Sequence, residues 1–211
     1  MTYTFRRLKA ENNKILYSIE NRYACFNTGL LTPTYEYIYA FFEANNKQSK
    51  SSQPFFFVGF FKGIDSRITS HFSILPEIAN YFSDPSLLIY NPNLPIAPNI
   101  EHIIADNTQR FPEALRNNPD LCRITMSGAI LDTQKRIRAN YKLAVPHWHC
   151  YMNKIQLLVP LYLLTPSGNP DLALAIEKVE NQYIARTCLT MAMAYQNARL
   201  IVKPESTWLL P

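Results

Sequence analysis

Three strand-length apolar segments lie near the C-terminal end of the chain, and they constrain the fold more than any other feature. They cover residues 155–164, 172–179 and 182–189. The turn-rich residues 166–170 separate the first two segments, and only residues 180–181 separate the second from the third. Such short connections join antiparallel strands, because a parallel crossover needs a dozen or more residues. The sequence therefore predicts a three-strand antiparallel meander.

A helix is predicted directly after the meander. Residues 190–199 are rich in alanine and methionine, which are strong helix formers. Tyr195, Asn197 and Arg199 are polar residues in this otherwise nearly uncharged segment. At 100° per residue, Tyr195 and Arg199 share one face with Ala192.

The length of the chain and the lack of an obvious linker favour a single domain. A chain of 211 residues suffices for one large domain or two small ones. It shows no internal repeat and no obvious interdomain linker. We therefore predict an α+β fold in one domain over residues 1–211, with a mainly antiparallel sheet, the C-terminal meander followed by a helix, and helices packed on the sheet.

In the N-terminal third of the chain, the sequence predicts one helix with a strand before it and a strand after it. Residues 23–31 indicate a strand that runs into a turn. Thr32 and Pro33 are typical of a helix start, and apolar side chains at i, i+3, i+4 and i+7 continue the pattern to residue 42. The polar residues 47–53 are expected to form an exposed loop. Residues 54–61 are aromatic and β-branched, which favours a buried strand.

The middle of the chain is rich in proline and asparagine, so only short elements are expected there. Residues 87–90 and 102–105 are predicted to be short strands. The clearest helix of this region is predicted over residues 128–143, with an apolar stripe at Ile130, Ile137 and Tyr141.

The net charge and the cysteines exclude only a few classes of function. A net charge of +5 permits an anionic partner without requiring one. No apolar run approaches the ~20 residues of a membrane span, so no membrane association is expected. The four cysteines are scattered without a CxxC pair, which favours buried thiols in a reducing, cytoplasmic compartment.

Familiar catalytic motifs are missing from the sequence. It contains no phosphate-binding loop, no GxGxxG, no GxSxG and no HExxH. His147 and His149 would point to the same side of a strand, which a metal could use. Because no matching ligand motif accompanies them, we expect no metal site and no cofactor.

More informative are polar residues that lie inside or just after apolar segments. A buried amide or guanidinium is costly unless it is hydrogen-bonded, so such groups either brace the core or line a pocket. The sequence leaves both readings open, with bracing slightly favoured. If they line a pocket, we expect them to converge at one cavity next to the closing helix. The residues in question are Asn27, Thr28, Asp106, Asn107, Arg110, Gln156, Tyr195, Asn197 and Arg199.

Four phrases of the sequence resemble one family of uncharacterised bacterial domains. They are CFNTGL at 25–30, DN with RFP at 106–112, IQLL with PL at 155–161, and AY with NARLI at 194–201. Members of this family are often found C-terminal to cold-shock-type OB modules or other RNA-binding modules. The resemblance therefore implies an RNA- or nucleotide-related role. It also implies an acidic residue at the position that Ala192 occupies here.

The first functional hypothesis is a binding module for RNA or a nucleotide. Basic side chains would contact phosphate, amides would read polar edges and exposed tyrosines would stack on bases. The alternative is that the basic helix face is simply solvated. The predicted contacts to phosphate are Arg110, Lys135, Arg138, Lys142 and Arg199, and those to polar edges are Asn27, Asn107 and Asn197.

Two further hypotheses belong to other classes. A hydrolase or phosphodiesterase acting on a nucleotide or RNA terminus would use Asp106 or Glu36 as base and His147 or His149 as acid, with Arg199 holding phosphate. Alternatively, the chain is a structural or protein-interaction domain, and a homodimer could form through its aromatic strands. We expect RNA or nucleotide binding first and the enzyme second.

Overall fold

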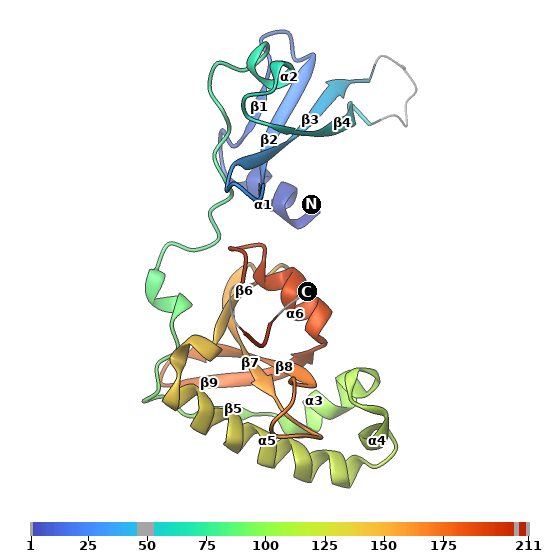
Figure 1. The fold of residues 1–211 in the computed structure, drawn as a ribbon, viewed down its shortest axis with the longest axis vertical. Helices are drawn as coiled ribbons and strands as arrows, with labels where there is room; N and C mark the ends of the chain where they lie inside the picture. Colours follow the sequence, from blue (N-terminus) through green and yellow to red (C-terminus); the bar gives the residue numbers. More distant parts are fainter. Residues whose placement is uncertain (1, 46–52, 205–206, 210–211) are drawn as a thin grey trace. The chain divides into compact units, whose positions relative to one another are not determined.

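The computed structural model describes residues 2–45, 53–204 and 207–209, and its chain divides into two compact units at Tyr81 and Phe82 (Figure 1). The α+β class is confirmed, as is mainly antiparallel strand pairing. The strands form two sheets rather than the one sheet that the sequence suggested. The single domain over residues 1–211 stays a prediction, and each unit is described by itself.

The N-terminal unit contains a four-stranded antiparallel sheet in the order β1-β2-β3-β4. A helix accompanies each face: Phe5 of α1 contacts Phe26 on one face, and Ile68 of α2 is buried with Cys25 and Phe41 on the other. The elements are α1 (Thr2–Ala10), β1 (Ile15–Tyr17), β2 (Tyr23–Leu31), β3 (Tyr37–Ala44), β4 (Phe55–Lys62) and α2 (Ser66–Thr69).

The helix predicted after Thr32 and Pro33 is wrong, because these residues form the turn into β3. Tyr35 lies in the left-handed region at φ 61°, where a helix cannot continue. The following residues are aromatic or β-branched and pair along their length with β2. The spacing of their apolar side chains is compatible with a helix and with a strand. Backbone pairing with β2 selects the strand.

The strand predicted over residues 54–61 is confirmed as β4, but its burial is not. Phe56, Phe57 and Phe60 are 46%, 47% and 47% exposed. The reason is that β4 lies at the edge of the sheet, with β3 as its one neighbour in the strand order. The loop predicted at residues 47–53 falls outside the described residues, apart from Gln53.

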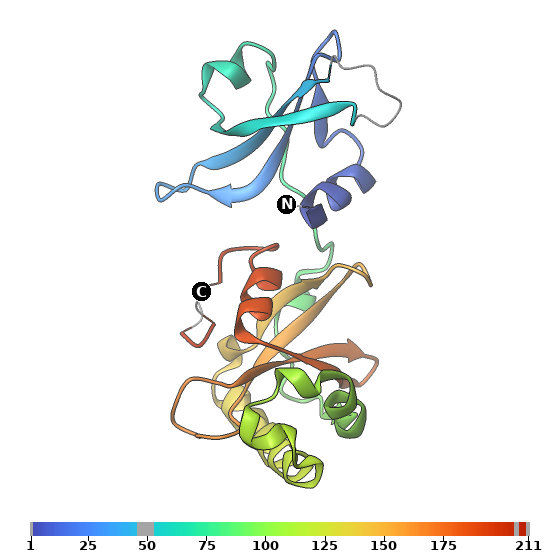
Figure 2. The ribbon, with the colours of Figure 1, turned by 90° about the vertical axis from the view of Figure 1, so that its right-hand side faces the viewer.

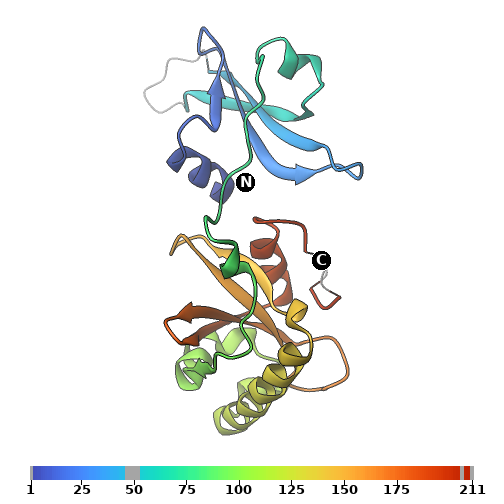
Figure 3. The same cartoon turned by 90° about the vertical axis from the view of Figure 1, so that its left-hand side faces the viewer.

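The C-terminal unit contains a five-stranded sheet in the order β5-β9-β8-β7-β6, seen from two further sides in Figures 2 and 3. The predicted meander and its closing helix are confirmed as β7, β8, β9 and α6. Only β5 runs parallel to its neighbour. The strands are β5 (Ile96–Pro98), β6 (Val145–His149), β7 (Lys154–Leu161), β8 (Leu172–Val179) and β9 (Gln182–Leu189); the α-helices are α3 (Ile100–Asn107), α4 (Glu113–Arg116), α5 (Pro119–Ala139) and α6 (Met191–Ala198).

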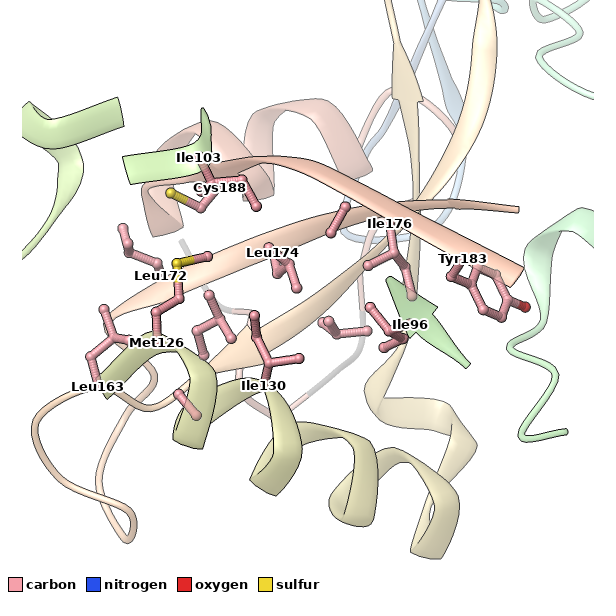
Figure 4. Close-up of a cluster of buried hydrophobic side chains, with 14 of the residues drawn as sticks. Ile96, Ile103, Met126, Ile130, Leu163, Leu172, Leu174, Ile176, Tyr183 and Cys188 are labelled. Carbon is pink, nitrogen blue, oxygen red and sulfur yellow. The ribbon is translucent and has the colours of Figure 1, made fainter. Parts of the chain in front are cut away.

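Both faces of this sheet are covered. Met126 and Ile130 of α5 pack on one face with Leu174 of β8, in the largest hydrophobic cluster (Figure 4). On the opposite face, Ala194 of α6 packs with Ala175, the next residue of β8. Because successive strand residues point to opposite faces, α5 and α6 lie on opposite sides of the sheet. Ile103 of α3 packs in the same cluster as Met126 and Ile130, so α3 lies on the α5 side of the sheet.

Two predictions in the middle of the chain are wrong. Residues 102–105 belong to α3, whose first turn is capped by the Asn99 side chain accepting from the His102 amide. Residues 87 and 88 belong to a 3-10 turn, η1 (Pro85–Leu88), that begins at a proline after the capping residue Asp84, and Ile89 and Tyr90 follow it outside any strand. Local side-chain caps, which are short-range signals, decided both segments. The helix predicted from residue 128 begins earlier, at Pro119.

Candidate functional site

The polar residues of β2 are used within the N-terminal unit. A β-bulge interrupts the pairing between Asn27 and Leu30, and Gly29 adopts φ 72° there. Asn27 Oδ1 accepts from the Gly29 amide at 3.0 Å, and Thr28 Oγ1 donates to the Ile38 carbonyl at 2.6 Å. Because these groups satisfy the backbone of the bulge, their contacts favour a bracing role.

Glu36 also belongs to the N-terminal unit, where it forms an exposed ion pair with Lys62. Its carboxylate is 2.6 Å from Lys62 Nζ and accepts from Thr34 Oγ1. The hydrogen bond and charge of Lys62 lower the pKa of this carboxyl. A lowered pKa makes Glu36 a weaker base, so its surroundings do not resemble those of a general base.

Asn107 and Arg110 form a network with the end of β9. Asn107 Oδ1 accepts from Thr187 Oγ1 at 3.0 Å and from Arg110 Nη1. The same Nη1 donates to the Cys188 carbonyl. The parallel pairing of β5 with β9 ends at Ala185, so Arg110 supplies the donor that a neighbouring strand would otherwise supply.

Removing this arginine is expected to destabilise the protein. Arg110→Ala leaves the Cys188 carbonyl and the Asn107 side chain short of a donor, which should lower the free energy of unfolding by roughly 2–4 kcal/mol. Chemical denaturation measures the change. The matched control is Arg186→Ala, which removes an exposed arginine of β9 and should change stability by less than about 0.5 kcal/mol. Equal losses in the two variants would show that the network is not the cause.

Asp106 and Arg199 do not share a surface. Asp106 is exposed on α3 and pairs with His102, whose Nε2 lies 3.2 Å from its carboxylate. Arg199 is exposed at the end of α6, on the other side of the sheet. A substrate held by both is not what this arrangement favours.

The largest groove among the described pockets lies where α5 gives way to β6. Its volume is about 670 Å³, a size typical of small-molecule sites. Tyr141, which is 53% exposed, lines it together with Lys142 and Lys203. None of the described residues lining it is acidic. The lining consists of Leu88, Ile89, Asn140, Tyr141, Lys142, Leu143, Ala144, Val145, Pro146, Val202, Lys203, Pro204 and Thr207.

Local chemistry builds this groove, which we call the η3 groove after the 3-10 turn η3 (Tyr141–Leu143). The helix α5 ends at Ala139, and the Asn140 side chain caps η3 by accepting from the Lys142 amide. Next to the groove, Trp208 Nε1 donates to the carbonyl of Leu143, a lining residue, at 2.9 Å. Lys135 and Arg138 are exposed on α5 outside the groove.

A second polar group lies on the face of the sheet that α6 covers. His147 of β6 pairs with Gln156 of β7, and cross-strand partners share a face. Gln156 Nε2 donates to Glu177 of β8 at 3.3 Å, and Lys154 Nζ donates to the other oxygen of that carboxylate. We call His147, Gln156, Glu177 and Lys154 the β6–β8 cluster.

His147 is buried as a neutral side chain. It is 1% exposed, and burial together with the neighbouring His149 lowers its pKa to about 4. Gln156 opposes this shift from its cross-strand position without a well-formed hydrogen bond. At neutral pH the ring therefore acts as a base or as a neutral hydrogen-bonding group, not as the acid that the sequence suggested. His149 is half-buried and accepts from the Met152 amide.

The residues of α6 border this face without joining the cluster. Tyr195 is half-buried against the core beneath α6, and Asn197 is half-buried near the helix end. Ala192, at the position where the resemblance implies an acid, is exposed in the first turn. The structure thus brings Gln156 to His147 and Asn107 to Arg110, in two groups rather than in one cavity.

Several residues of both sites escaped the sequence reasoning. Lys154 alternates with apolar residues in β7, which was a usable signal for a polar face, whereas Glu177 lies directly before Lys178 in β8. The meeting of Lys154 with Glu177 depends on the register of three strands, which no local pattern gives. Asn140, Tyr141 and Lys203 come together only when the chain end returns to η3.

Comparison with known families gives one match, to a domain of unknown function (DUF3825) over residues 1–208. No curated protein and no solved structure matches the chain. Within the described residues, no helix is long and apolar enough to cross a bilayer. No three histidine, cysteine, aspartate or glutamate side chains in the described part of the chain are placed to hold a metal ion.

Proposed function

This chain belongs to the DUF3825 family of domains of unknown function, and from its own residues we propose that it binds RNA or a nucleotide, with phosphate held in the η3 groove. The observation that supports this most is the charge of the groove lining. Lys142 and Lys203 both line it, and no acidic residue does among those described. Lysine binds phosphate as a compact point charge.

Neighbouring groups in the groove suit the rest of a nucleotide. Tyr141 exposes a ring on which a base can stack, and Asn140 carries an amide for a polar edge. Lys135 and Arg138 extend the positive charge along α5, which suits a longer RNA strand. An association with RNA-binding modules, as the resemblance implies, points the same way and stays a prediction.

Direct binding measurements test this proposal. We expect fluorescently labelled single-stranded RNA to bind with an affinity that falls steeply with salt, because each neutralised phosphate adds about 0.7 to the logarithmic slope for single strands. Fluorescence anisotropy at several salt concentrations measures that slope, and a thermal shift with mononucleotides measures ligand stabilisation. Absence of binding to every RNA and nucleotide at low salt would refute the proposal.

One observation, in the β6–β8 cluster, favours the enzyme hypothesis. A neutral histidine, a carboxylate and a lysine on adjacent strands are residue types that acid–base catalysis uses. The residues differ from those expected, since Asp106, Glu36 and Arg199 take no part in the cluster. We keep hydrolysis of a nucleotide or RNA end as the alternative function, and release of product from the bound RNA would reveal it.

We also propose that β4 is the contact through which a homodimer forms. Its outer edge has no strand partner in the described sheet, and its phenylalanines are exposed. Such an edge accepts a strand of another chain. Light scattering should show a dimer whose population falls strongly in Phe57→Lys. The control Leu131→Lys changes an exposed apolar residue of α5 and should leave the mass unchanged. A monomer at all concentrations would contradict this proposal.

A cytoplasmic location is proposed from the thiols. No disulfide joins the four cysteines, all of which lie in the described residues, and Cys25, Cys122 and Cys188 are buried. Burial raises the pKa of Cys25 and of Cys188 to about 12, so these two thiols remain protonated and unreactive. Free thiols suit a reducing compartment.

A further inference from the structure

Unsatisfied polar atoms are concentrated at one place in the C-terminal unit. Three buried side-chain nitrogen or oxygen atoms in the described residues have no hydrogen-bond partner, and all belong to His147 and Gln156. They are both ring nitrogens of His147 and Oε1 of Gln156. Other buried polar side chains, such as Asn27 and Asn107, have their groups paired. A buried polar atom without a partner costs stability, so this pair is not explained by bracing the core.

The free groups define what the pair can bind. A neutral imidazole offers one acceptor nitrogen and one N–H donor. Gln156 Oε1 offers a second acceptor. Glu177 adds little, because Lys154 Nζ and Gln156 Nε2 already engage its two oxygens. The pair therefore presents two acceptors and one donor to a ligand.

This pattern disfavours phosphate and fits a neutral group. Ionised phosphate presents acceptor oxygens, which would meet the two acceptors of the pair without hydrogen bonds between them. The matching ligand group carries two donors and one acceptor. Two parts of a nucleotide have this chemistry: the vicinal diol of ribose, and a base edge with an amino group beside a ring nitrogen. The uracil edge has one donor between two acceptors and matches poorly.

The pair lies next to the η3 groove along one strand. Val145 lines the groove and is also buried in the cluster beneath α6. His147 follows two residues later, so its side chain points to the same face about 7 Å further along β6.

We infer that the His147–Gln156 pair binds the neutral part of the nucleotide, its base edge or its ribose diol, while the phosphate stays with Lys142 and Lys203. This inference rests on the proposed function and deepens it. It fixes the direction in which the nucleotide lies: phosphate toward η3, and the neutral end toward the sheet beneath α6. Since His147 is 1% exposed, the side chains around it must move for the ligand to enter.

Calorimetric titration of the full chain with four probes tests the inference. The probes are AMP, UMP, 2′,3′-dideoxy-AMP and inorganic phosphate. In Gln156→Leu, AMP should bind about tenfold more weakly than in the wild type, while inorganic phosphate should bind within twofold of the wild-type value. In Lys142→Glu, both AMP and phosphate should weaken. A wild type that prefers AMP to UMP assigns the base edge, and one that prefers AMP to the dideoxy analogue assigns the diol.

The outcomes separate this inference from the proposed function. If AMP binds Gln156→Leu as tightly as the wild type, while Lys142→Glu binds AMP more weakly, the inference is wrong. The proposed phosphate binding in the η3 groove is then unaffected. If neither AMP nor phosphate binds the wild type, both are wrong. Should Gln156→Leu fail to fold, Glu177→Gln replaces it, because it keeps the side-chain shape and removes the charge that orients the Gln156 amide. Tenfold weaker AMP binding by that variant supports the inference, and unchanged binding overturns it.

Discussion

Reversing both lysines of the η3 groove, in Lys142→Glu/Lys203→Glu, is expected to weaken RNA binding by about 100-fold or more. Two charge-assisted contacts of roughly 1.5–3 kcal/mol each are lost, and two carboxylates then repel phosphate. The slope of the logarithm of affinity against the logarithm of salt should fall by about 1.4 for single-stranded RNA. Anisotropy titrations of a labelled RNA at three or more salt concentrations measure both quantities.

A control of equal charge separates the groove from the net charge of the protein. Lys9→Glu/Lys178→Glu also changes two exposed lysines to glutamates, and neither residue lines the groove. Long-range steering alone would weaken RNA binding to a similar extent in both double variants. We expect the control to lose no more than about fivefold, a loss that screening by salt should remove. Equal losses would place the RNA elsewhere.

Stability is expected to fall in mild acid, and His147 is the reason. Its pKa is about 4 in the folded protein against 6.5 for an ordinary histidine. Above pH 6.5 the ring is neutral in both states, so it imposes no penalty. Between pH 6.5 and 4 the unfolded chain binds a proton that the folded chain does not, so the free energy of unfolding falls as the pH falls. The total loss is roughly 3 kcal/mol, at about 1.4 kcal/mol for each pH unit.

Replacing the ring should remove this loss. His147→Leu is expected to flatten the stability profile between pH 6.5 and 4, and at pH 7 to be neutral or stabilising by about 1 kcal/mol, because two unpaired nitrogens leave the core. Urea denaturation across this pH range measures the profile. His102→Leu, which changes an exposed histidine, should retain the acid loss. A large destabilisation of His147→Leu at pH 7 would show that the ring is needed for packing.

How much of the fold the sequence could predict depended on the range of the interactions. The meander and α6 were predictable, because short turns force adjacent strands to pair and Thr190 caps the helix locally. The division of the strands into two sheets was not, since it depends on which distant segments meet. β3 shows the same limit: its apolar spacing suits either helix or strand, and the partner β2 decided between them.

The candidate sites divide in the same way. The polar character of Gln156 and His147 was visible in the sequence, but their pairing follows from the register of β6 and β7. The charge on Lys142 was visible too, whereas Lys203 joins it only in the folded chain, where Trp208 also bonds to Leu143 of η3. Sequence patterns therefore identified candidate groups, and nonlocal packing decided which of them act together.

The contact between Arg110 and β9 has a consequence for how α6 is held. The chain leaves Cys188 and enters the cap of α6 two residues later, at Thr190. The guanidinium of Arg110 thus bonds the chain just before α6, beside the backbone pairing of Cys188 with Leu174 of β8. Without that cation, the β8–β9 ladder alone would position the chain where it enters α6.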